Sequence, residues 1–135
     1  MTESAAAPPP ALEEARRWVG NRVDEIGGAE VGQVQGFFAD AGDGKPSWLI
    51  ARQGRFRGTL VAIPMADCAA GGGRVWVAHE REAIRSAPVV DPTRPLLREH
   101  ELTICSHYGI GERVGRAAEV AGRPAASVTS TPAPA

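Results

Sequence analysis

Three arginines and one phenylalanine lie within the short stretch from residue 52 to residue 58, at Arg52, Arg55, Phe56 and Arg57. Guanidinium groups form paired hydrogen bonds with phosphate, and an aromatic ring can stack on a nucleobase. The same composition is typical of a solvated hairpin tip, because charged side chains are mostly exposed. The whole chain carries a net charge of -1, which gives no general attraction to a polyanion. We therefore interpret the stretch as a hairpin tip, and nucleic-acid binding through these residues is the alternative.

The histidines and cysteines do not have the spacing of a metal site or a nucleophilic pair. If residues 96–108 form a helix, Cys105 and His107 point about 200° apart, and His100 and His107 lie about 10 Å apart along its axis. Neither pair can bind one tetrahedral ion. A Cys–His nucleophile would also need a third group that orients the imidazole, and none is evident. The sequence therefore predicts no metal site.

Two glycine-rich stretches lack the context of a phosphate-binding loop. Residues 71–73 lead into a predicted strand and are not followed by the Lys-Ser/Thr pair of a P-loop. Residues 109–115 read G-x-G-x-x-x-G after a predicted helix, which does not match the dinucleotide fingerprint. We expect no cofactor and no enzymatic activity. An enzyme would require a pocket in which His79, His100 or Asp67 converge.

The length and composition are typical of one small domain between two tails. A chain of 135 residues has room for one hydrophobic core. Residues 1–10 and 110–135 are rich in Ala, Pro, Ser and Thr and are expected to be disordered, because they cannot bury enough apolar surface. No apolar run is long enough for a membrane helix. Cys68 and Cys105 are expected to be reduced thiols, and the protein is expected to be cytoplasmic.

The elements that position these groups are predicted to be mainly short strands. Turn residues recur about every 8 to 12 positions between apolar runs, as in an antiparallel meander. After a first run that ends at Val23, strands are predicted over residues 32–40, 47–53, 59–63 and 74–78, and short helices over 10–19, 79–87 and 96–108. The strand over 47–53 is apolar on both faces. It should therefore be central, or part of a barrel whose outer face is covered by another element.

Phe37 and Phe38 are adjacent in one predicted strand. Successive side chains in a regular strand point to opposite faces, so both rings cannot point inward. One of them should form an exposed patch or lie beneath a helix. An exposed ring would be a candidate contact in a dimer, and both residues are therefore candidate partner-binding residues.

The order of these signals resembles the PRC-barrel family over about residues 18 to 109. The matching segments are Gly20 to Val23, Gly28-x-x-x-Gly32-x-Val34, Asp40, Trp48-Leu49-Ile50, Leu60 to Pro64, Arg74 to Val77, Ala87-Pro88 and His107-Tyr108-Gly109. The sequence departs from the family pattern at Ala78, where a proline is usual, and at His79, where an aromatic residue is usual. The resemblance implies a mainly β fold, with a small closed or partly open PRC-type β-barrel of about five to six short antiparallel strands. Short helices would flank this barrel in a domain over residues 11–109.

The same resemblance implies a function in binding and assembly. It predicts a non-catalytic, protein-binding adaptor or scaffold that forms a homodimer and docks on a protein partner that the family does not specify. The alternative is a ribosome- or RNA-associated assembly factor that uses the basic hairpin from Arg52 to Arg57.

Overall fold

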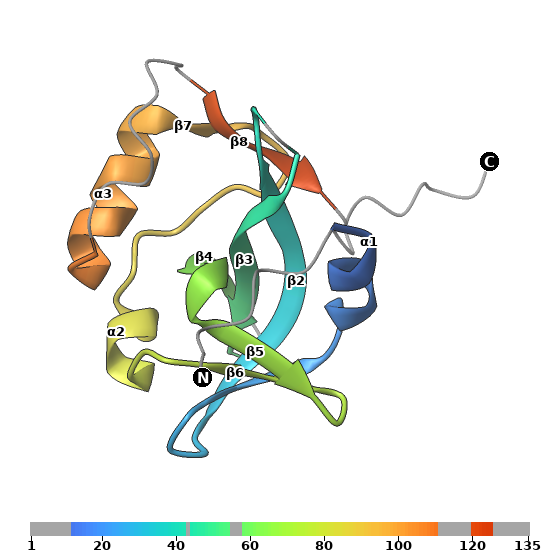
Figure 1. Cartoon of the computed structure of the whole chain (residues 1–135). Helices are drawn as coiled ribbons and strands as arrows, with labels where there is room; N and C mark the ends of the chain where they lie inside the picture. Colours follow the sequence, from blue (N-terminus) through green and yellow to red (C-terminus); the bar gives the residue numbers. More distant parts are fainter. Residues whose placement is uncertain (1–11, 43, 55–57, 111–119, 126–135) are drawn as a thin grey trace, which may run out of the picture.

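The computed structural model describes residues 12–42, 44–54, 58–110 and 120–125 (Figure 1). Within these residues the chain is mainly β. The strands are β1 (Arg22–Glu25), β2 (Glu30–Asp40), β3 (Pro46–Gln53), β4 (Thr59–Pro64), β5 (Cys68–Gly71), β6 (Arg74–Val77), β7 (Leu96–Leu97) and β8 (Val120–Ala125). The helices are α1 (Leu12–Ala15), η1 (Arg16–Trp18), η2 (Met65–Asp67), α2 (Arg81–Arg85) and α3 (Arg98–Tyr108). The expected tail of residues 1–10 lies outside the described residues.

The strands form one sheet in the order β4-β3-β2-β1-β6-β5. The long strand β2 pairs with β1 along its first half and with β8 along its last residues, Phe37 to Asp40. The β1–β6 pair is parallel, so the expectation of antiparallel strands throughout is wrong. A parallel pair requires a long connection, and here the connection is the whole run from β2 to β5.

The sheet curls without closing. Strands β4 and β5 stand at opposite ends of the strand order, yet only the three residues of η2 join them along the chain. The two ends of the sheet must therefore approach each other at this corner. Among the described strands, β4 and β5 are not paired, so the closed form of the expected barrel is not found.

Each face of the curled sheet carries its own hydrophobic core. The inner core includes Trp18, Phe37 and Leu49, and the outer core includes Trp48, Ile50 and Ile104. Figure 1 shows α1 and α3 on opposite sides of β2 and β3. The two-faced apolar pattern of β3 therefore predicted correctly that another element covers the outer face, and that element is α3 together with β7.

Phe37 and Phe38 are both buried, with exposed fractions of 0% and 1%. Phe37 belongs to the inner core, whereas Phe38 lies in the outer core with residues of α3. The expectation that one ring lies beneath a helix is confirmed for Phe38. The expectation of an exposed patch is wrong, and neither ring is available as a surface contact.

A buried polar contact connects α3 to the sheet. The Trp48 indole donates its Nε1–H to Glu101 Oε2 at 2.8 Å, and Arg98 Nη1 donates to Glu101 Oε1 at 2.5 Å. Glu101 is 3% exposed and Trp48 is fully buried. The carboxylate thus holds the first turn of α3 against the middle of β3.

Several elements begin or end at other residues than the sequence predicted, most clearly in the C-terminal part of the chain. Helix α3 begins at Arg98 because Leu96–Leu97 pairs with β8 as β7, and it ends as predicted before Gly109, whose φ is 69°. Helix α2 is shorter than predicted. Residues 120–125 were expected to belong to a tail, but they form β8, in which Gly122 lies against the Phe38 side chain.

No helix among the described residues is long and apolar enough to cross a membrane.

Candidate functional site

Part of the outer face of the sheet is left uncovered by α3 and β7. In β3, Trp48 and Ile50 lie beneath α3, and Arg52 follows on the same face but is exposed. On the neighbouring strands, Arg52 is paired with Gln33, Gln33 with Arg22, and Arg22 with Arg74. Directly paired residues share a face. These four residues, from β3, β2, β1 and β6, therefore form a row across the outer face, which we call the arginine row.

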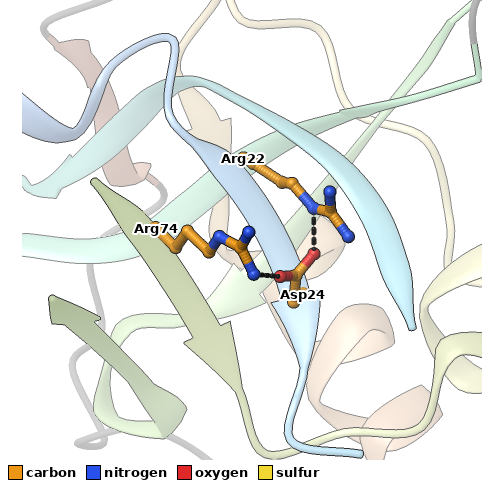
Figure 2. Close-up of polar contacts among 3 residues, drawn as sticks. All are labelled: Arg22, Asp24 and Arg74. Atoms are coloured by element: carbon orange, nitrogen blue, oxygen red, sulfur yellow. Dashed lines mark hydrogen bonds and ion pairs between the residues drawn. The ribbon is translucent and has the colours of Figure 1, made fainter. Parts of the chain in front are cut away.

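A buried carboxylate fixes two members of this row (Figure 2). Arg22 Nε donates to Asp24 Oδ1 at 2.7 Å, and Arg74 Nη1 donates to Asp24 Oδ2 at 3.4 Å. The Asp24 side chain is 1% exposed, whereas those of Arg22 and Arg74 are 42% and 51% exposed. The hydrogen bond that Arg22 donates to the Asp24 carboxylate raises the pKa of Arg22 above its ordinary value. Asp24 thus orients two guanidinium groups that remain accessible to solvent.

Most donors of these two guanidinium groups remain available. A guanidinium has five N–H donors. Among the described residues, Arg22 contacts Asp24 only through Nε and Arg74 only through Nη1. Figure 2 shows the terminal nitrogens of Arg22 directed away from Arg74. The arrangement can therefore bind an oxyanion through free, oriented N–H groups.

An aromatic side chain lies beside the row. Trp76 is paired with Asp24 and lies two residues after Arg74, so it shares the outer face. Its ring extends over β5, because a Cβ added at Gly71 would lie 3.5 Å from Trp76 Cζ3. The ring is half-buried, and it offers an apolar surface next to the charged groups.

The Arg52 end of the row opens into a groove of about 710 Å³. Among the described residues, the polar side chains that line it are Glu30, Gln33, Arg52 and Arg81. Arg81 is the first residue of α2, so the start of this helix lies at the groove. The Arg81 backbone N–H donates to Glu25 Oε2 at 2.6 Å. Within the described part of the chain, the guanidinium groups of Arg52 and Arg81 have no ion-pair partner.

One member of this surface, Arg52, was predicted from the sequence as a candidate binding residue. Arg52 is exposed and belongs to the row, whereas Arg55, Phe56 and Arg57 lie outside the described residues. Arg22, Arg74 and Arg81 were missed, because strand register brings together positions that are far apart in the sequence. A sequence signal did exist for Arg22 and Arg74, since both occupy the polar positions of strands whose alternate residues are Val23 and Val75.

Two of the three residues that an enzyme hypothesis required do meet. His79 Nε2 lies 2.7 Å from Asp67 Oδ2, and the His79 ring centroid lies 4.7 Å from that of Tyr108. The Tyr108 hydroxyl donates to the Ala62 carbonyl at 2.7 Å, and burial raises the pKa of Tyr108. This cluster joins η2, the end of β6 and the end of α3. None of its members lines the groove described above, and within the described part of the chain His100 makes no hydrogen bond, ion pair or ring contact with them.

The thiols and histidines do not gather into a metal site in the described part of the chain. The Cys68 thiol donates to the Pro64 carbonyl at 3.3 Å, and Cys105 is buried in the outer core. Neither is in a disulfide.

Comparison with known proteins gives no family for the chain. No protein-family model matches it, and no curated protein is significantly similar to it.

Proposed function

We propose that the chain is a non-catalytic module of the PRC-barrel type that binds a protein partner as an adaptor or scaffold and self-associates as a homodimer. A curled sheet whose end strands are joined by three residues supports a partly open barrel of this type. The short helices that pack outside the sheet also agree with the flanking helices expected for such a barrel. Side chains fill the space inside the curl, so binding must use the outer surface.

The uncovered half of the outer face carries this proposal. Helix α3 and β7 cover the apolar half, and the other half presents the arginine row with Trp76 beside it. Arg and Trp are enriched at the contacts that contribute most to protein–protein binding. Because Phe37 and Phe38 are buried, we place the partner contact on the arginine row.

The test combines light scattering with site-specific crosslinking. A photoreactive residue at Gln33, in the middle of the row, should crosslink a defined partner in cells, and unmodified protein should compete for that product. The same residue at Thr103, on the exposed side of α3, is the control. Light scattering should give twice the mass of the chain. A monomer whose Gln33 variant yields no product beyond the Thr103 control would contradict the proposal.

A ribosome- or RNA-associated assembly factor is the second proposal. It is favoured by the alignment of Arg52, near the end of β3, with Arg22 and Arg74, because Arg52 begins the basic stretch of the sequence that also includes Arg55 and Arg57. Co-sedimentation with ribosomal subunits, weakened by salt, would support this function over the first.

A further inference from the structure

We infer that the arginine row is a receptor for carboxylates, and that the partner contributes an extended acidic segment that bridges Arg22 and Arg74 and reaches Arg52. The inference rests on the proposed protein-binding function and specifies the chemistry of the partner. Two observations support it: the buried Asp24 that orients one arginine pair, and the groove that holds a second pair.

The first anchor is the Asp24-bound pair. Two arginines and one aspartate leave a single positive charge, and the Arg22 and Arg74 side chains are 42% and 51% exposed. One carboxylate balances that charge, and its two oxygens match the planar fork of a guanidinium. Because Asp24 already orients both side chains, little rotamer entropy is lost when an oxyanion binds.

The second anchor is the groove. Arg52 and Arg81 line it together with Glu30, and the Glu25 carboxylate accepts from the Arg81 backbone N–H. Over both anchors, the four arginines outnumber the carboxylates of Asp24, Glu25 and Glu30 by one. Arg22 and Arg52 are separated by two strand spacings, or about 10 Å. An extended segment of the polyproline II type has three residues per turn and rises about 3.1 Å per residue, so its side chains at i and i+3 lie on one side, about 9 Å apart. The neutral Gln33 lies between the two anchors. It would face the uncharged residues that separate the two carboxylates of the partner segment.

The alternation of arginines with carboxylates along this surface favours a protein segment over a nucleic acid as the ligand. Each anchor includes its own carboxylate, Asp24 or Glu30, so a continuous run of phosphates would meet negative charge as well as positive. The net charge of the chain, -1, also gives no long-range attraction to a polyanion. A protein segment can place single carboxylates at the two anchors and an apolar side chain on Trp76.

The test is an NMR titration of the full chain with a peptide whose core is Glu-Ser-Ser-Glu. We expect shifts of the Arg22 and Arg74 Nε–H signals and of the Trp76 indole, and none for a matched peptide with Gln in place of Glu. The double variant Arg22→Lys/Arg74→Lys keeps the charge but loses the fork, and should weaken binding about tenfold or more. Arg94→Lys, at an exposed arginine elsewhere, should have no effect.

The variant Asp24→Asn distinguishes two explanations of peptide binding. One is the orientation of Arg22 and Arg74 by Asp24, and the other is a general positive charge on this surface. A positive field predicts tighter peptide binding, because a negative charge is removed. Orientation by Asp24 predicts weaker binding. If circular dichroism shows that this variant is unfolded, the lysine variants decide the question.

Five results would overturn the inference: absence of shifts at the row, equal shifts with the Gln peptide, unchanged binding by the lysine variants, tighter peptide binding by a folded Asp24→Asn variant, or tighter binding of an oligouridylate than of the Glu peptide. Any of these, together with a competed crosslink at Gln33, would leave the protein-binding function standing with a partner of different chemistry.

Discussion

Replacing Glu101 by alanine should weaken the attachment of α3 to the sheet. Its carboxylate accepts hydrogen bonds from the Trp48 indole and from Arg98, and it is 3% exposed. Glu101→Ala removes both contacts and takes the acceptor away from a fully buried N–H. Removal of one partner from a buried charged pair costs about 3 to 5 kcal/mol, so we expect a loss of that size in the free energy of unfolding.

Two further variants separate the contributions of the Glu101 charge and of the Trp48 hydrogen bond to this loss of stability. Glu101→Gln keeps an oxygen for the indole but loses the charge, and a neutral hydrogen bond is weaker than a charged one by about 1 kcal/mol. Trp48→Phe removes the donor and leaves most of the ring volume. In a double-mutant cycle, Trp48→Phe and Glu101→Ala should couple by about 1.5 to 3 kcal/mol, the range for a hydrogen bond to a charged group.

Urea unfolding followed by far-UV circular dichroism measures these differences without using Trp48 as the probe. Glu99→Ala is the matched control, because Glu99 lies in the same first turn and is exposed. It should change stability by no more than about 1 kcal/mol, the value of a carboxylate near a helix N-terminus. Two results would contradict the inference that Glu101 attaches α3 to β3. One is a loss of stability below about 1 kcal/mol in Glu101→Ala, and the other is a coupling energy within the additivity error of about 0.5 kcal/mol.

Two other predictions concern a titration and a close backbone approach. Burial raises the pKa of Tyr108, the single tyrosine, so its folded-state phenol should remain protonated above the ordinary value of about 10. Stability should therefore be unaffected below about pH 10 and fall as the pH rises above it, because the unfolded chain ionises first. Tyr108→Phe should flatten this fall, and tyrosinate absorbance that develops at the ordinary pKa in folded protein would contradict it. Gly32→Ala would place a Cβ 1.9 Å from the Arg52 carbonyl oxygen and should cost about 3 kcal/mol or more. Gly71→Ala makes only an ordinary contact with Trp76 and should stay within about 0.5 kcal/mol, so equal thermal shifts for the two would argue against the close approach.

Local patterns were sufficient to predict β2, β3, β4 and β6 to within about two residues. Their apolar residues and bounding turns lie within each strand. The prediction that β3 is covered on its outer face also held, because its two-faced apolar composition is visible in the sequence. Strand β8 was not predictable in the same way. It contributes backbone pairing and small residues such as Gly122, and its composition is that of a tail.

The candidate site depended on long-range register and was mostly missed. Arg22, Arg52 and Arg74 become neighbours only through the β1–β2, β2–β3 and β1–β6 pairings, and the last of these is parallel. Glu101 has the same character. It interrupts the apolar stripe of α3 in the sequence, and its partner Trp48 becomes evident only when α3 is placed on β3.

A register shift in β2 determines where the exposed half of the outer face begins. Gln33 lies on the outer face and Val34 in the inner core, so strict alternation would place Phe37 outward and Phe38 inward. The register shifts between Val34 and Gly36, and Phe37 belongs to the inner core while Phe38 faces α3. A bulge of this kind changes which side chains face each side. The first half of β2 can therefore present Gln33 to solvent beside the arginines of β1 and β3, while its second half is apolar on both faces and is covered by α3. The arginine row is exposed because the apolar outer surface that α3 covers ends at this shift.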